Sequence, residues 1–251
     1  SYNAAREPEI VDLQALLRSM GARVNGAGGS IITVEGGAAL HGCTHRVIGD
    51  RIVCATYLCA AAAAGGEVRL TGVDYRAVST VALSLAESGC EVRSEADAVS
   101  LRSTGALRSV RPVRTAPYPG FPTDAQPVLM AALLRSEGCT VFVENIFENR
   151  YRHVDELSRM GAEIRVVGRV AVVNGVRTLH GAAVKCTDLR GGAALVIAGL
   201  SAEGTTRVTE LTHIDRGYDA IERDLAALGA QIRRELSLIH ISEPTRQEAI
   251  S

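Results

Sequence analysis

The sequence has no tryptophan and only one lysine, Lys185, and aromatic residues make up 4% of its 251 residues. Arginine therefore supplies nearly all of the positive charge. Either the base composition of the genome or a need for forked hydrogen bonds to anions would produce such a high ratio of arginine to lysine. The formal net charge of −1 gives no field that would gather nucleic acid or an anionic membrane surface. We therefore expect neither nucleic acid nor a membrane as a partner.

The sequence also lacks any Cys-x-x-Cys pair, and its six cysteines do not form a disulfide framework in a chain of this length. We therefore expect no metal site and no cofactor, and a reducing, cytoplasmic location. The longest apolar run, residues 54–64, is too short to span a bilayer. A hydrophobic content of 47% is nevertheless ample for the buried cores of one large or two ordinary domains.

A helix that ends in glycine recurs four times, and the four glycines lie 68, 72 and 68 residues apart. Each glycine is a typical left-handed helix stop, and an alternating, strand-like pattern follows it at once. These glycines are Gly21, Gly89, Gly161 and Gly229. The first of these helices, residues 8–20, has an apolar side and Pro8 at its first position.

The last three units contain a second, earlier helix that also ends in glycine and runs into a strand. The predicted helices are residues 50–65, 124–138 and 188–204, and the predicted strands are residues 67–71, 140–144 and 205–209. Each repeat unit is therefore predicted to have the element order β-α-β-α-β, with room for one more strand. This order predicts an α/β fold whose helices pack together under sheets. Residues 235–251 depart from the pattern and resemble translated sequencing adaptor, so we exclude them as an artefact.

The segment 117–126 carries three prolines within six residues, which predict a stiff, extended backbone up to Thr123. A helix follows, with Thr123 as its N-cap and Asp124 in its first turn, where the helix dipole favours an anion. Asp50 and Asp188 occupy the corresponding helix starts of their own units. A purely structural role at the helix N-terminus is therefore the alternative to a functional role for Asp124.

Five separated motifs stand outside the repeat. They are NAAREPEIV (3–11), RTAPYPGFPTD (114–124), FENR (147–150) with HV (153–154) and LSRMGA (157–162), TDLR (187–190) and HIDRGY (213–218). On these motifs, residues 3–234 resemble the enolpyruvyl transferase family, in its UDP-N-acetylglucosamine branch.

The resemblance implies inside-out α/β barrel domains, each built from three β-α-β-α-β-β units, with the active site in the cleft between two domains. Residues 1–48 would be the C-terminal remnant of the first domain and residues 49–234 most of the second, so that the chain would be N-terminally truncated. The implied reaction moves the enolpyruvyl group of phosphoenolpyruvate to the 3′-hydroxyl of UDP-N-acetylglucosamine by addition and then elimination of phosphate. This step opens peptidoglycan synthesis.

The resemblance also implies a set of substrate-binding residues, of which Asp124 and Arg216 would be catalytic. The set is Asp124, Ile146, Arg150, Asp188, Arg190 and Arg216. Asp124 would contact the attacking hydroxyl as a candidate general base. The arginines would bind carboxylate and phosphate groups through forked donors.

The residues themselves leave other interpretations open. Arg216 also fits a solvated surface arginine, Arg190 an ion-pair partner of Asp188, and Ile146 an ordinary core residue. None of the six cysteines matches the catalytic cysteine of the family, so we expect this polypeptide alone to be inactive. The alternative hypotheses are a 3-phosphoshikimate 1-carboxyvinyltransferase and a non-catalytic module that binds a sugar nucleotide.

Overall fold

The computed structural model of the chain describes residues 1–235. They fall into two compact units, Ser1–Asp219 and the described part of Ala220–Ser251. The second unit contains α8 (Ile221–Ala227). The predicted artefact at residues 235–251 lies outside the described residues except for Glu235. The predicted domain boundary between residues 48 and 49 stays a prediction.

The first elements of the chain are α1 (Pro8–Ser19), β1 (Arg23–Asn25) and β2 (Thr33–Glu35), and the two strands pair antiparallel. The predicted helix is confirmed, and proline stands in its first turn, where a missing N–H costs nothing. No residue of α1 is buried among the described residues, and Val11 remains 41% exposed. The predicted apolar side of this helix is therefore only partly covered within the described residues, where Ile10, Leu16 and Leu17 are half-buried.

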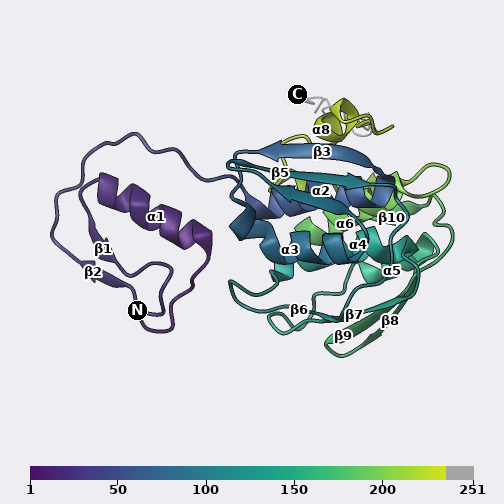
Figure 1. The fold of residues 1–251 in the computed structure, drawn as a ribbon, viewed down its shortest axis with the longest axis horizontal. Helices are drawn as coiled ribbons and strands as arrows, with labels where there is room; N and C mark the ends of the chain where they lie inside the picture. The colour runs from purple at the N-terminus through teal and green to yellow at the C-terminus, as the bar shows by residue number, and fades with distance from the viewer. Residues whose placement is uncertain (236–251) are drawn as a thin grey trace, which may run out of the picture. The chain divides into compact units, whose positions relative to one another are not determined.

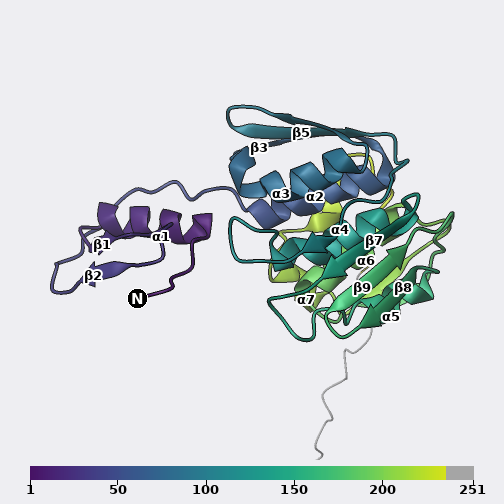
Figure 2. The same cartoon turned by 60° about the horizontal axis from the view of Figure 1, so that its bottom comes forward.

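Three buried helices form the centre of the first unit. They are α2 (Arg51–Ala64), α4 (Gln126–Ala132) and α6 (Leu189–Leu200), which contact one another. All three are rich in alanine and leucine and have almost no charged residue beyond the first turn, as is typical of helices buried on every side. Figures 1 and 2 show them between a sheet that contains β3 and β5 and a sheet that contains β7, β8 and β9.

The first of these sheets has the strand order β3-β5-β4 and is antiparallel throughout. Its strands are β3 (Gly66–Thr71), β4 (Glu91–Ser94) and β5 (Ala98–Ser103), and α3 (Tyr75–Glu87) connects the first two. The predicted strand at residues 67–71 is therefore confirmed.

The second sheet has the order β6-β7-β9-β8, in which β6 runs parallel to β7 and the other pairs are antiparallel. Its strands are β6 (Val113–Arg114), β7 (Cys139–Val143), β8 (Glu163–Val167) and β9 (Val170–Asn174), and α5 (Val154–Arg159) lies between β7 and β8 in the chain. With α4, this middle unit has the element order β-α-β-α-β-β. The third sheet pairs β10 (Ala183–Lys185) with β11 (Arg207–Thr209) in parallel, and α7 (Thr212–Asp215) follows.

The four repeat glycines all have left-handed backbones, with φ between +91° and +109°, as their positions at helix ends predict. A strand follows Gly21, Gly89 and Gly161. The strand expected after Gly229 does not form within residues 230–235, because none of them pairs with a described strand.

The proline segment differs from its prediction. Gly120 donates its N–H to the carbonyl of Pro117 at 2.8 Å, and Ala116 donates to the carbonyl of Phe121 at 3.0 Å. The segment therefore closes into a loop instead of extending, because its free backbone donors find carbonyls within the loop itself. The Tyr118–Pro119 peptide bond in this loop is cis.

The helix predicted after the loop forms, with a short 3₁₀ turn at each end. The turns are η1 (Thr123–Ala125) and η2 (Leu133–Arg135), on either side of α4. The prediction that Thr123 caps this helix is wrong, because its hydroxyl donates instead to Glu144. Among residues 1–235, no helix is both long and apolar enough to cross a membrane.

Candidate active site

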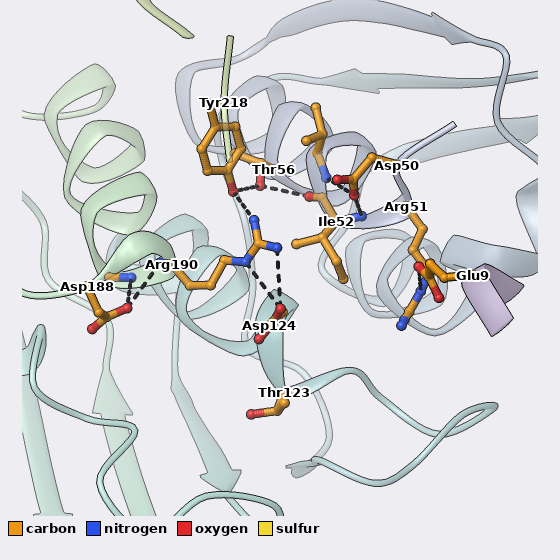
Figure 3. Close-up of polar contacts among 12 residues, drawn as sticks. Glu9, Asp50, Arg51, Ile52, Thr56, Thr123, Asp124, Asp188, Arg190 and Tyr218 are labelled. Atoms are coloured by element: carbon orange, nitrogen blue, oxygen red, sulfur yellow. Dashed lines mark hydrogen bonds and ion pairs between the residues drawn. The ribbon is translucent and has the colours of Figure 1, made fainter. Parts of the chain in front are cut away.

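Asp124 lies between two arginine side chains that come from distant parts of the chain. Its Oδ1 accepts a hydrogen bond from Nη2 of Arg150 at 2.5 Å, and its Oδ2 accepts one from Nε of Arg190 at 3.3 Å. The carboxylate is 39% exposed, whereas the side chains of Arg150 and Arg190 are 16% and 12% exposed. Figure 3 shows the guanidinium of Arg190 directed at Asp124. A partly open carboxylate thus faces two mostly buried cations.

The three aspartates at equivalent helix starts have different partners. Asp50 caps α2 by accepting from the N–H groups of Ile52 and Val53, and Asp188 caps α6 by accepting from those of Arg190 and Gly191. Asp124 makes no side-chain cap on η1 or α4. Side-chain capping therefore describes Asp50 and Asp188 but not Asp124, which lies in the first turn of η1 and pairs with the two arginines.

Arg190 is held in place by Asp124 and by Tyr218. Its Nη1 donates to the Tyr218 hydroxyl at 3.2 Å, and that hydroxyl lies 2.8 Å from Oγ1 of Thr56 on α2. Thr56 in turn donates to the carbonyl of Ile52. Burial alone would lower the pKa of Arg190, but Tyr218 and Asp124 together raise it above its ordinary value. Arg190 is therefore a fixed and permanent cation.

Arg150 reaches the same place from the loop that follows β7. Besides its contact with Asp124, its Nη2 donates to the carbonyl of Thr123 at 3.3 Å. Its guanidinium also lies over the ring of Phe147, 5.5 Å from the centroid. Arg150 thus connects the loop 145–150 to the turn that carries Asp124.

The remaining predicted site residues have other positions. Ile146 follows β7 with 38% of its surface exposed, so it is not an ordinary core residue. Asp188 is the cap of α6 already described. Arg216 is exposed at the end of α7, and within residues 1–235 no hydrogen bond or ion pair of its side chain is found. The structure therefore brings Asp124, Arg150 and Arg190 together but does not bring Arg216 into contact with them.

Sequence reasoning missed two residues that support this cluster. Tyr218 is 3% exposed and bonds Arg190, yet nothing in its motif distinguishes it from a core tyrosine. Glu144 is 1% exposed and accepts a hydrogen bond from Thr123, next to Asp124. The burial of Glu144 could have been predicted from the sequence. Thr140, Phe142 and Glu144 occupy alternate positions along one extended segment and so lie on the same, buried face.

The arrangement suits the binding of a ligand with negative charge beside a hydroxyl group. Two guanidinium groups can donate paired, charge-assisted hydrogen bonds to carboxylate or phosphate oxygens. The exposed part of the carboxylate can accept a hydrogen bond from a hydroxyl group. Within the described residues, no group of three or more His, Cys, Asp or Glu side chains is placed to hold a metal ion.

Comparison with known proteins gives relatives along almost the whole chain. Residues 1–225 match the family model described as EPSP synthase (3-phosphoshikimate 1-carboxyvinyltransferase). A UDP-N-acetylglucosamine 1-carboxyvinyltransferase of Gluconacetobacter diazotrophicus is 53% identical over 92% of this chain and 55% of its own length. A protein of the same name from Zymomonas mobilis is 50% identical over 92% of this chain and 54% of its own length. The chain thus spans about half the length of these curated relatives.

Solved structures give the same result. The enolpyruvyl transferase NikO from Streptomyces tendae has a TM-score of 0.79 at 30% identity, covering 92% of this chain and 55% of its own. An EPSP synthase from Acinetobacter baumannii has a TM-score of 0.70 at 19% identity over 89% of this chain and 55% of its own, which shows the shared fold. The chain belongs to the EPSP synthase (3-phosphoshikimate 1-carboxyvinyltransferase) family, whose fold is that of the enolpyruvyl transferases.

Proposed function

We propose that this chain forms the part of a UDP-N-acetylglucosamine 1-carboxyvinyltransferase that carries Asp124, Arg150 and Arg190. The proposed reaction transfers the enolpyruvyl group of phosphoenolpyruvate to the 3′-hydroxyl of UDP-N-acetylglucosamine, in the cytoplasm. The observation that carries the proposal is the position of the Asp124 carboxylate, which is free of the helix cap and lies between two guanidinium groups. The names of relatives at 53% and 50% identity support this choice of substrates.

In this proposal Asp124 accepts the proton of the sugar hydroxyl as that hydroxyl attacks C2 of phosphoenolpyruvate. A general base has to lie within hydrogen-bond reach of the proton it removes, and the exposed part of the carboxylate allows that approach. A general acid, which the proposal assigns to the half of the enzyme that this chain does not span, protonates C3 of phosphoenolpyruvate. The tetrahedral adduct then loses phosphate and returns a C3 proton to the conjugate base of that acid. The enolpyruvyl ether and inorganic phosphate are the products.

The arginines have binding roles in the proposal. Arg190, and with it Arg150, offers forked donors to the phosphate or carboxylate of the ligands. Arg216 is exposed and has no partner within residues 1–235, so its guanidinium is available to phosphoenolpyruvate. Ile146, in the loop after β7, borders the sugar nucleotide, and Asp188 holds the start of α6 from which Arg190 projects.

We also propose the finer architecture. The buried position of α2, α4 and α6 beneath sheets supports an inside-out α/β barrel made of β-α-β-α-β-β units. Residues 49–234 would belong to this barrel, and residues 1–48 to a preceding domain of the same kind.

A second candidate function is 3-phosphoshikimate 1-carboxyvinyl transfer, because the matching family model carries that description. Both reactions use phosphoenolpyruvate and differ in the hydroxyl that attacks. The acceptor therefore decides between them.

The test joins the N-terminal part of the Gluconacetobacter diazotrophicus relative to this chain, with the intact relative as positive control. Phosphate release from phosphoenolpyruvate is measured with UDP-N-acetylglucosamine and with shikimate 3-phosphate as acceptors. We expect release with the sugar nucleotide, and a loss of about 100-fold or more in kcat for Asp124→Asn. Asp50→Asn is the matched control, because it changes the equivalent aspartate of another unit and keeps a capping oxygen. A preference for shikimate 3-phosphate, or equal effects of the two substitutions, would refute the proposal.

A further inference from the structure

Glu144 is a buried carboxylate that lies directly behind the candidate active site. It follows the last residue of β7 and is 1% exposed. A buried carboxylate is costly unless hydrogen bonds replace the water that it has lost. A carboxylate in this position therefore needs several donors, and the structure provides four.

The four donors belong to three separate segments of the chain. Oε1 accepts from the hydroxyl of Thr115 at 2.9 Å and from the N–H groups of Ile146 and Phe147 at 2.7 Å and 3.0 Å. Oε2 accepts from the hydroxyl of Thr123 at 2.9 Å. One side chain thus joins the residue after β6, the turn η1 and the loop after β7.

Two of these segments carry the functional groups of the candidate site. Thr123 is bonded to Asp124 through the peptide chain, and its carbonyl accepts a hydrogen bond from Arg150. Ile146 and Phe147 begin the loop that leads to Arg150, and the Phe147 ring lies under its guanidinium. Glu144 and Arg150 therefore hold the same turn from two sides. Glu144 accepts from the Thr123 hydroxyl, and Arg150 donates to the Thr123 carbonyl and the Asp124 carboxylate.

We propose that Glu144 is a positioning residue of the candidate active site, which fixes the turn carrying Asp124 and the loop carrying Arg150 relative to each other. It touches neither the proposed ligands nor the reacting atoms and acts through Thr123 and the loop 146–147. A pair of apolar side chains would fill the same space at a lower desolvation cost. The carboxylate is distinguished by its ability to accept four directed hydrogen bonds at once and so to define one geometry.

The proposal rests on the proposed function only for its ligand, UDP-N-acetylglucosamine. The experiment therefore has one readout without ligand, the NMR signals of the Arg150 guanidinium, and one with ligand, the Kd for UDP-N-acetylglucosamine by calorimetry. The variants are Glu144→Gln, Glu144→Ala and Thr123→Val. Thr140→Val is the matched control, because it removes another threonine hydroxyl, which accepts from the N–H of Val110 at 3.2 Å and lies outside this network.

We expect Thr123→Val and Glu144→Ala to shift or broaden the Arg150 signals. Thr123→Val removes one hydrogen bond to a charged group and should weaken ligand binding about tenfold, and Glu144→Ala removes all four and should weaken it at least as much. Glu144→Gln should retain both properties of the native protein. Its amide oxygen can take the place of Oε1, and its NH₂ group can donate to the Thr123 hydroxyl, which also accepts. Thr140→Val should lower the urea midpoint while leaving the Arg150 signals and the Kd unchanged within about twofold.

Unchanged Arg150 signals in Thr123→Val would overturn the proposal, and so would equal changes in Thr140→Val. Failure of Glu144→Ala to fold would leave Thr123→Val and Glu144→Gln to decide. If the chain joined to the N-terminal part of its relative does not bind UDP-N-acetylglucosamine, the proposed ligand is wrong, and the Arg150 signals still test the positioning role by themselves.

Discussion

His153 is completely buried, and neither of its ring nitrogens has a hydrogen-bond partner among the described residues. It precedes α5, and its Cβ lies against Gly191 in the first turn of α6. Burial lowers the pKa of His153 from 6.5 to about 4; the Asp188 carboxylate and the Arg150 backbone oppose the shift, and the Arg150 charge adds to it. The folded protein thus keeps this imidazole neutral at a pH where the unfolded chain protonates it.

The sign of the effect on stability follows from proton binding. Between the folded pKa of about 4 and the unfolded value of about 6.5, the unfolded chain binds more protons at this site, so acid favours unfolding. Stability from the neutral histidine is fully present above pH 7 and declines as the pH falls. The expected loss is about 2 kcal/mol between pH 7 and pH 5 and about 3 kcal/mol between pH 7 and pH 4.

His153→Leu tests this value, because leucine has a similar volume and does not titrate. The free energy of unfolding is measured by urea denaturation for both proteins at pH 7, 6, 5 and 4. All other titrating groups are common to the two proteins, so the difference between them isolates His153. We expect the native chain to lose about 2 kcal/mol relative to the variant by pH 5. Parallel pH dependences would show that His153 is hydrated or protonated in the fold and would refute the reasoning.

Three further predictions concern the surroundings of the site. Asp188→Ala removes the cap of α6 and should lower the free energy of unfolding by about 1 kcal/mol, whereas Asp188→Asn keeps an acceptor and should lose less; urea denaturation compares them. Tyr218→Phe leaves Arg190 without its buried hydroxyl partner and should cost about 1–2 kcal/mol, so an unchanged urea midpoint would contradict that contact. In the native protein a thiol reagent should rapidly modify the exposed Cys43 and Cys139 and reach the four buried thiols only on unfolding, which counting modified thiols by mass spectrometry checks.

Much of the fold could be predicted because its signals are local. The glycines at residues 21, 89 and 161 need a left-handed backbone, and that requirement is visible wherever a helix pattern ends in glycine. Helix α2 begins one residue after Asp50, as capping chemistry predicts. The loop at residues 117–121 was mispredicted, because proline rules describe each residue separately and not the hydrogen bonds that close the segment.

The site was harder to predict because its distinguishing contacts are long-range. Asp50, Asp124 and Asp188 occupy equivalent positions in the repeat, and only the arrival of Arg150 and Arg190 distinguishes the second from the other two. Those arginines lie 26 and 66 residues away in the sequence. No periodic sequence pattern predicts contacts between residues so far apart in the chain. Only the resemblance to a family indicated that Asp124, Arg150 and Arg190 belong to one site.

The most direct test of the central claim is a crystal structure of the chain, joined to the N-terminal part of its relative, with UDP-N-acetylglucosamine bound. The measured quantity is the distance from the nearer Asp124 carboxylate oxygen to the 3′-oxygen of the sugar. The proposal predicts a hydrogen bond of about 2.6–3.2 Å, with Arg150 or Arg190 within reach of an anionic group. A sugar nucleotide bound elsewhere, with Asp124 still paired to both arginines, would contradict it.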